Sequence, residues 1–345
     1  MPEVTKITDI EAYKRLGLNE ELIPFFITSE VIANKLKEGY SFYIFTSKSY
    51  DCLIFLSVKN RYTFFKHGQF EYPPVTFLGA RLTTADEKVF MNEVLDCITK
   101  NNLCDKIVCP PLTDIYYSYP EKPGVKVCKF GNFVIDLENK TYEQVFGAFN
   151  SNYRQKIRKT EKEGAKYESG KNMLDIFYST YSDLMVREHK KIDNKQFFVN
   201  LINNNNVLCA GVFLNGACEG VLLAPYTKFM AYSLYGASAA KTQLIGSNKY
   251  LQAEIIREAM QRGAKKYSLG GCRLGTKGIT PKIAGIQDYK KRFGAEIING
   301  YLWKADLNFK AKLYDFMFAT YTLVRYRKTF NDLIDQSENF AWNER

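Results

Sequence analysis

The stretch YGASAAKTQLIGSNKYLQAEIIREAMQRGAKKYSLGG (residues 235–271), with the later segment GIQDYKKRFGAE (residues 285–296), carries the clearest structural signals of this 345-residue chain. Apolar side chains at helical spacing predict an amphipathic helix over 248–262 with one buried face. Those apolar residues are Leu251, Ile255, Ala259 and Met260. The later segment has the composition of a short basic helix. The order is therefore strand end, polar loop, helix, strand, loop and helix, and the rest of the chain is arranged around it.

The ends of the predicted helix carry signals of their own. Ser247 is expected to be its N-cap, and Gly263 stands where a left-handed residue commonly ends a helix. Residues 266–269 have the pattern of a strand, and a strand–helix–strand unit of this length predicts a right-handed parallel crossover. The loop before the helix is expected to present backbone N–H groups to an anionic or carbonyl-bearing ligand.

This arrangement resembles a known family. The pattern GAS…N-x-x-L-x-x-E-x-I…GG…GI-x-x-Y-K-K-x-F-G-x-E is similar to the C-terminal half of FemABX-type aminoacyltransferases and to related acyltransferases of the GNAT superfamily, labelled BioF2-like or CelD-like. The segment SNYRQKIRKTEKEG (residues 151–164) resembles the family's basic helix. The chain departs from the family at Ala253, where Trp is common, and at Ser268, where Asp is common, and both differences concern the acceptor pocket. The matching residues are Gly236, Ala237, Ser238, Asn248, Leu251, Glu254, Ile256, Gly270, Gly271, Gly285, Tyr289, Lys290, Lys291, Phe293, Gly294 and Glu296.

The resemblance implies an α/β (α+β) fold of tandem GNAT-like domains, each with a mixed, mostly antiparallel sheet flanked by helices. The predicted elements agree, because three strands, a helix and a strand occur in this order twice. We expect an N-terminal domain over residues 1–140, a C-terminal catalytic domain over 141–307, and a helix within 308–345 that packs on the first domain. Strands are predicted over 41–46, 52–58, 61–66, 75–78, 106–109, 207–214, 219–226 and 229–235, helices over 85–100, 142–164, 172–191 and 309–328, and hairpin turns at Lys59–Asn60 and Asn215–Gly216.

The composition restricts partners and compartment. The net charge of +11 and the pI near 9.0 predict an anionic partner, which is RNA, a nucleotide-linked precursor or a lipid surface, unless the excess charge only keeps the protein soluble. The eight cysteines form no C-x-x-C pair and, with only two histidines, predict reduced thiols rather than disulfides or a metal site. Residues 1–16 have no apolar core, and no apolar run is long enough to span a bilayer. The chain is therefore predicted to be cytoplasmic, with peripheral membrane association and no DNA partner.

Lys290 is the catalytic candidate. Acyl transfer to an amine needs a neutral amine, donors for the oxyanion, and charge or a proton for the leaving group. Lys290 lies in the YKK motif beside Lys291 and Arg292, and the family resemblance points to the same lysine. A partly desolvated Lys290 would act as an acid/base, whereas a cationic one would stabilise the oxyanion or the leaving ribose or thiolate. The structural alternative is a solvated helix end.

The basic helix supplies candidates for substrate binding. Arg154, Arg158 and Lys162 share one stripe, while Tyr153 and Ile157 are expected to face inward. Such a stripe suits the phosphate oxygens of a nucleotide, a tRNA or a lipid pyrophosphate, and the alternative is an exposed charged face. The full set of substrate-binding candidates is Arg154, Arg158, Tyr235, Ser238, Asn248, Tyr250, Glu254, Arg273 and Tyr289.

Other features give weaker signals. Glu254 is expected to face away from the apolar stripe. Arg273 lies in a Gly/Lys-rich loop, but no helix visibly follows this loop, so the pattern is only weak support for a phosphate-binding loop. His67 fits a turn and His189 a helix end, so both are expected to be structural. The pyrophosphate loop of CoA-binding GNATs, Q/R-x-x-G-x-G/A before the main helix, is not recognisable in KTQLIGSN (residues 241–248), which counts against acyl-CoA as donor.

The resulting hypothesis is an N-acyltransferase that moves an aminoacyl or acyl group onto the amine of a phosphate-bearing cell-envelope precursor or an amino sugar. No cofactor is expected to be bound permanently, and aminoacyl-tRNA is favoured slightly over acyl-CoA as donor. Two alternatives remain open. One is an acyl-CoA-dependent GNAT N-acyltransferase in polysaccharide biosynthesis, and the other is a non-catalytic RNA- or nucleotide-binding protein with a degenerate GNAT fold.

Overall fold

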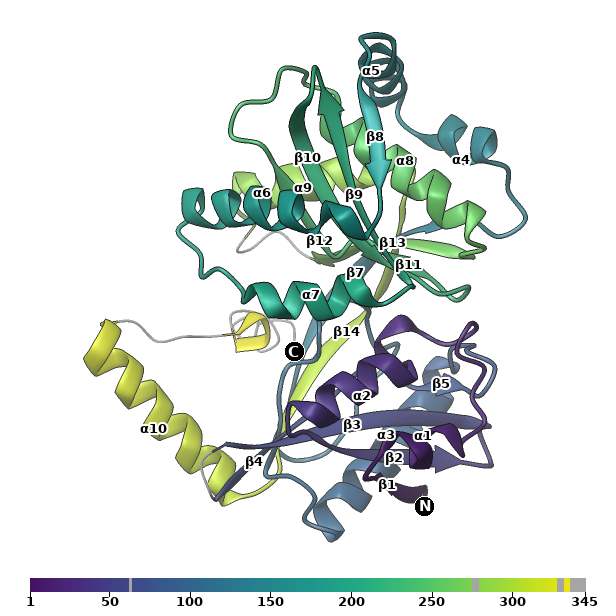
Figure 1. Ribbon diagram of the computed structural model, residues 1–345. Helices are drawn as coiled ribbons and strands as arrows, with labels where there is room; N and C mark the ends of the chain where they lie inside the picture. Colours follow the sequence, from purple (N-terminus) through teal and green to yellow (C-terminus); the bar gives the residue numbers. More distant parts are fainter. Residues whose placement is uncertain (62–63, 275–278, 328–331, 336–345) are drawn as a thin grey trace. The chain divides into compact units, whose positions relative to one another are not determined.

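The computed structural model describes residues 1–61, 64–274, 279–327 and 332–335. The chain forms two compact units (Figure 1). Unit 1 contains Met1–Asn132, Gly271–Ile279 and Asn299–Arg345, and unit 2 contains Phe133–Gly270 and Thr280–Ile298. Three strands pass from one unit into the other, namely β7 (Val125–Asp136), β13 (Lys266–Arg273) and β14 (Glu296–Asp306). Each unit is therefore built from separate chain segments.

Unit 1 packs helices on a sheet. Its other strands are β1 (Glu3–Ile7), β2 (Ser41–Ser47), β3 (Cys52–Arg61), β4 (Phe65–Phe70), β5 (Val75–Thr76) and β6 (Lys106–Ile107). Its helices are α1 (Ile10–Lys14), the 3-10 helix η1 (Phe25–Ile27), α2 (Ser29–Lys37), α3 (Thr84–Lys100) and α10 (Phe309–Tyr326). The core joins the buried side of α3 to the strands and includes Trp303 of β14. Thr83 fixes the start of α3, because its hydroxyl accepts from the N–H of Asp86.

Unit 2 places helices around β9 and β10. Its other strands are β8 (Lys166–Ser169), β9 (Val207–Leu214), β10 (Ala217–Pro225), β11 (Ala231–Tyr232) and β12 (Tyr235–Ser238). Its helices are α4 (Tyr142–Ala148), α5 (Ser151–Lys162), the 3-10 helix η2 (Lys171–Met173), α6 (Leu174–Arg187), α7 (Lys195–Asn203), α8 (Ser247–Gln261) and α9 (Pro281–Lys291). Helix α8 lies against β9 and β10 with α5 beside it, while α6 and α7 also contact β9 (Figure 1). Because β9 is buried along almost its whole length, both of its faces are covered.

The strands form two sheets. One has the order β1-β2-β3-β4-β6-β14-β7-β13-β11 with β5 beside β3, and the other has the order β12-β10-β9-β8. The pairs with a described register are antiparallel, except that β4 pairs with β6 and β11 pairs with β13 in parallel. The predicted α/β class with mixed, mostly antiparallel sheets is therefore confirmed.

The predicted strand over 229–235 proves to be two strands in different sheets. The parallel partner of β13 is β11, so the predicted parallel crossover runs from β11 through α8 to β13, while β12 lies in the other sheet. The N-cap of α8 is Gly246 and not Ser247, whereas Gly263 has a φ of +84° and ends the helix as predicted. The expectation of one buried face is wrong, because residues outside the predicted apolar stripe, such as Gln252 and Ile256, are buried as well, and Gln252 donates to the hydroxyl of Tyr267 on β13 at 2.6 Å.

Two further predictions differ from the structure. The predicted helix over 142–164 is broken at Asn150, whose side chain caps α5 by accepting from the N–H of Asn152. The predicted hairpin at Lys59–Asn60 is wrong, since β3 continues to Arg61 while paired with β4. The turn at Asn215–Gly216 is confirmed, because both residues have positive φ, 50° and 79°, between β9 and β10.

The side-chain inventory of the described residues is simple. All eight cysteines lie among the described residues outside any disulfide, and six of them are buried. Within residues 1–61, 64–274, 279–327 and 332–335, no group of three or more His, Cys, Asp and Glu side chains is arranged to hold a metal ion. None of the helices described is long and apolar enough to cross a membrane.

Candidate functional site

The loop before α8 is organised by a buried carboxylate that the sequence patterns do not reveal. Glu219 of β10 is only 1% exposed. Its oxygens accept from the N–H of Gln243 at 3.0 and 2.8 Å, from the N–H of Leu244 at 3.2 Å and from the hydroxyl of Ser247 at 3.0 Å. The expectation that this loop offers its N–H groups to a ligand is therefore wrong for Gln243 and Leu244. The carboxylate of Glu219 occupies the position that a bound anion would take at these N–H groups.

Three predicted site residues come together at the start of α8. The side-chain amide of Asn248 donates to the hydroxyl of Ser238 on β12 at 2.6 Å. The hydroxyl of Tyr289 on α9 donates to the backbone carbonyl of Asn248 at 3.2 Å. Residue 220 must be small, because a Cβ on Gly220 would stand 2.5 Å from the Asn248 side-chain oxygen. These contacts hold β10, β12, α8 and α9 in one arrangement.

Two cations lie over the ring of Tyr153 and a third is near one of them, and we call Tyr153, Lys156, Lys249 and Arg292 the Tyr153 cluster. The ring of Tyr153 lies 6.0 Å from that of Tyr289, with the Lys249 ammonium 5.1 Å and the Arg292 guanidinium 5.9 Å from its centre. Burial lowers the pKa of Lys249, and the nearby charges of Lys156 and Arg292 lower it further. Arg292 already pairs with the carboxylate of Asp288 at 2.7 Å, and the like charges beside Lys249 favour a further anion there.

A close approach of α5 to α8 creates the Tyr153 cluster. A Cβ on Gly246 would stand 2.0 Å from the Thr160 hydroxyl and 2.7 Å from the Lys156 carbonyl. Only glycine fits here, and it lets α5 bring Lys156 beside the first turn of α8. The sequence shows the glycine and the lysines, but it does not show that three segments meet at one ring.

The predicted basic stripe of α5 lies on another side of that helix. Tyr153 and Ile157 are buried, as predicted. Arg154 donates to the carbonyls of Gly147 and Phe149, the latter at 2.6 Å, so its guanidinium binds the end of α4. Arg158 is exposed, with its guanidinium 5.5 Å from the ring of Phe146.

Lys290 is half-buried in the last turn of α9. Its ammonium lies 5.9 Å from the ring centre of Phe133 and would stand 3.5 Å from a Cβ placed on Gly270. Gly270 has a φ of +81°, in the left-handed region that favours glycine. Lys290 therefore reaches back over β13, while its neighbour Tyr289 reaches α8.

The remaining candidates lie elsewhere. Tyr235 packs its ring against those of Tyr181 and Phe198, at 6.1 and 5.3 Å. Tyr250 is buried on α8. The expectation that Glu254 faces away from the core is wrong: it is buried, burial raises its pKa, and it pairs with Arg257 at 2.9 Å.

The loop candidate and the histidines need separate mention. Arg273 ends β13 in unit 1, and the loop residues 275–278 that follow lie outside the described residues. The expectation that His67 occupies a turn is wrong, because it lies within β4 and pairs with β3 and β6. His189 follows α6 with a φ of 52°, so it does stand at a helix end.

Comparisons with known proteins bear on the fold. No protein-family model matches the chain, and no curated protein does. The structure of FemX matches 91% of this chain and 99% of its own, with a TM-score of 0.67 and 13% identity. The C-terminal DUF2156 domain of a protein from Agrobacterium fabrum, described as a lysylphosphatidylglycerol synthetase, matches 82% of this chain and 89% of its own, with a TM-score of 0.51 and 14% identity. A tandem GNAT protein from the clavulanic acid pathway has a TM-score of 0.47 and 9% identity over 89% of this chain and 99% of its own.

At these identities the likeness concerns the fold alone. The chain has an α/β fold with two sheets that matches the structure of FemX over nearly its whole length, so the expected FemX-like fold is confirmed.

Proposed function

We propose that the chain is an aminoacyltransferase that moves an aminoacyl group from tRNA to the amine of a phosphate-bearing cell-envelope precursor or amino sugar. The FemX-like fold supports acyl transfer in general. The observation that carries the choice of donor is that the carboxylate of Glu219 on β10 accepts from N–H groups of the loop before α8.

This carboxylate disfavours acyl-CoA. CoA-binding GNATs use the loop before their main helix for the pyrophosphate, and here Glu219 already occupies its N–H groups at Gln243 and Leu244. A phosphate placed about 4 Å from this carboxylate would be repelled by about 4 kcal/mol per pair of unit charges at the effective dielectric constant near a protein surface. A donor whose phosphates bind elsewhere avoids this repulsion.

The Tyr153 cluster is the better place for those phosphates. Lys249 and Arg292 lie over the ring of Tyr153, and Lys156 is close enough to lower the pKa of Lys249 by its charge, although Arg292 also pairs with Asp288 at 2.7 Å. Arg154 on the predicted stripe is instead engaged with the end of α4. An anion beside Lys249 would relieve the repulsion between the three cations. The cluster therefore favours phosphodiester groups of the donor RNA.

Lys290 is the residue that we assign to the chemical step. The acceptor amine attacks the ester carbonyl, a C–N bond forms, the ester C–O bond breaks, and a proton from the amine passes to the leaving ribose oxygen. An ammonium at Lys290 would stabilise the oxyanion or donate to the leaving oxygen. Tyr289, Asn248 and Ser238 would fix α9 and β12 around that step.

Binding measurements with donors test the proposal. We expect charged tRNA to raise the melting temperature and acetyl-CoA to leave it unchanged at matched concentration. Lys156→Ala with Lys249→Ala should weaken tRNA binding and reduce its salt dependence, because phosphate contacts are lost. The exposed pair Lys159→Ala with Lys166→Ala is the matched control. Stabilisation by acetyl-CoA alone would overturn the choice of donor.

A further inference from the structure

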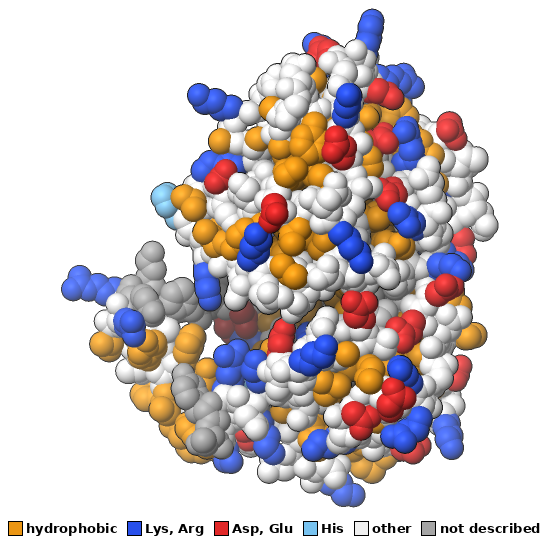
Figure 2. All heavy atoms as spheres, in the orientation of Figure 1, with side chains coloured by type: hydrophobic (Ala, Val, Ile, Leu, Met, Phe, Trp, Pro, Cys, Tyr) orange, Lys and Arg blue, Asp and Glu red, His pale blue; other side chains and the backbone are white. Residues whose placement is uncertain are grey.

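Helix α10 exposes an apolar face of unusual size. Phe316 is 71% exposed and Val324 is 78% exposed, and other large apolar side chains lie along the same helix face. Those further side chains are Phe309, Leu313, Met317 and Leu323. Figure 2 shows hydrophobic side chains gathered where Figure 1 places α10. This face carries large apolar side chains like those of a buried helix face, but it is exposed.

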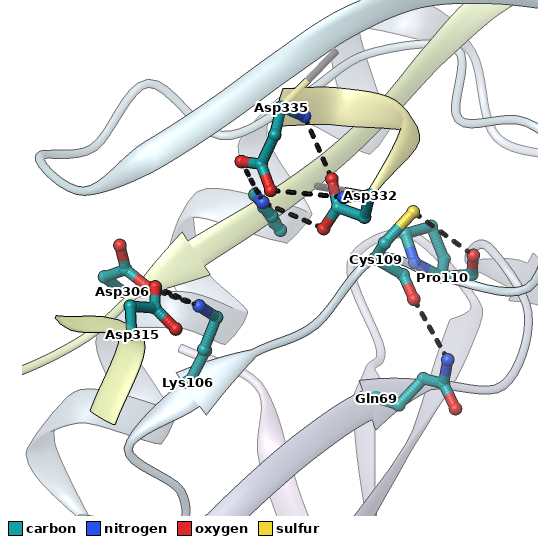
Figure 3. Close-up of polar contacts among 9 residues, drawn as sticks. Gln69, Lys106, Cys109, Pro110, Asp306, Asp315, Asp332 and Asp335 are labelled. Carbon is teal, nitrogen blue, oxygen red and sulfur yellow. Dashed lines mark hydrogen bonds and ion pairs between the residues drawn. The ribbon is translucent and has the colours of Figure 1, made fainter. Parts of the chain in front are cut away.

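The opposite side of α10 is fixed to unit 1. Tyr314 stacks on Phe65 of β4 with ring centres 4.4 Å apart. Asp315 forms an ion pair with Lys106 of β6, which also lies 3.3 Å from Asp306 (Figure 3). The contacts of Tyr314 and Asp315 fix the rotation of α10 about its own axis. The apolar face on the other side of the helix is therefore exposed. The prediction from the sequence is a helix within 308–345 that packs on the first domain, and it does not say which face of the helix would do so.

Basic residues accompany the apolar face. Lys310 and Lys312 stand on its two flanks in the first turn of α10, and Arg325 and Arg327 stand at its other end. The one carboxylate of the helix, Asp315, is already paired with Lys106. An apolar face with long cationic side chains along its edges is typical of helices that lie in a membrane interface.

We propose that α10 docks in the headgroup region of an anionic lipid bilayer, with its apolar face toward the acyl chains and its cations at the lipid phosphates. A second copy of the chain fits this face less well, because pairing two such helices would bring their basic edges together. The inference does not depend on the proposed transferase activity, since the surface is described without any substrate.

Vesicle co-sedimentation tests the proposal on the full chain without substrates. We expect binding to phosphatidylcholine/phosphatidylglycerol vesicles that salt weakens, and at least tenfold weaker binding to pure phosphatidylcholine. Phe316→Asp with Val324→Asp should reduce binding to the anionic vesicles more than tenfold. Lys310→Ala with Lys312→Ala should reduce it by about fivefold per residue.

A matched control separates docking from a general loss of apolar surface. Leu78 is 73% exposed in unit 1 and outside α10, and Leu78→Asp should bind vesicles like the unchanged protein. The substituted side chains are all exposed, so melting temperatures should stay the same. Equal binding by the Phe316/Val324 variant, or equal binding to neutral vesicles, would overturn the proposal. So would a lipid-free dimer that this variant turns into a monomer.

Discussion

Replacing Glu219 by Gln tests the loop that leads into α8. The substitution keeps the size of the side chain but removes its charge and turns one acceptor oxygen into an NH2 donor. In the structure the carboxylate accepts from two backbone N–H groups and from the Ser247 hydroxyl, at 2.8 to 3.2 Å. The amide oxygen would keep some of these hydrogen bonds, but without the negative charge. The NH2 group of the amide would face a group that also donates, and two donors form no hydrogen bond.

The size of the effect follows from those bonds. A hydrogen bond to a charged group contributes about 1.5–3 kcal/mol, and a neutral one contributes about 1 kcal/mol. Three weakened bonds give a loss of about 3 kcal/mol, which is partly offset because a buried charge is no longer desolvated. We expect Glu219→Gln to lower the free energy of unfolding by about 2 kcal/mol.

Urea denaturation followed by circular dichroism measures this change. The midpoint should fall while the slope against urea stays the same. Ser247→Ala is the control, because it removes one of the donors and should cost about 1 kcal/mol. A Glu219→Gln variant within about 0.5 kcal/mol of the unchanged protein would refute the account of this loop.

Three further predictions concern other parts of the chain. Lys290→Ala should reduce turnover at least a hundredfold in a transfer assay with little change in melting temperature; full activity would remove its catalytic role. Gly246→Ala should destabilise the protein by about 1–3 kcal/mol in urea, because its Cβ would meet α5, whereas Gly285→Ala, with nothing within 4 Å, should be neutral or stabilising. Burial, with the charges of Arg61 and Lys106, lowers the pKa of His67 to about 4. The unfolded chain therefore binds more protons between about pH 6.5 and pH 4, and stability should fall by about 1–2 kcal/mol as the pH drops through this window, with no contribution above it. His67→Phe should abolish this part of the pH dependence, and an unchanged dependence in that variant would contradict the assignment.

Local patterns predicted the parts of the fold that depend on local chemistry. Gly263 ends α8 and Asn215–Gly216 turns a hairpin, because positive φ is needed at those positions and few residues adopt it. The strand β14 was not predicted, and it contains Asn299–Gly300, a pair that is more common in turns than in strands. The structure gives the reason for the glycine: a Cβ on Gly300 would stand 2.3 Å from the Tyr116 carbonyl. This glycine allows β14 to approach the segment that contains Tyr116 and does not form a turn.

The candidate site likewise contains residues that a sequence pattern predicts and residues that only tertiary contacts reveal. The family pattern pointed to Ser238, Asn248 and Tyr289, and the structure joins these three by hydrogen bonds. Glu219 was not identified, because its partners Gln243 and Leu244 are distant in sequence and no pattern links a strand carboxylate to a later loop. Contacts of this kind depend on tertiary packing, and sequence spacing does not encode them.

Transfer of a radiolabelled amino acid is the most direct test of the proposed activity. The purified chain would be given either tRNA charged with labelled amino acids or labelled acetyl-CoA, together with a nucleotide-linked envelope precursor that carries a free amine. We predict that label moves from the charged tRNA to the precursor and that Lys290→Ala abolishes the transfer. Label that moves from acetyl-CoA alone, or from neither donor, would contradict the account.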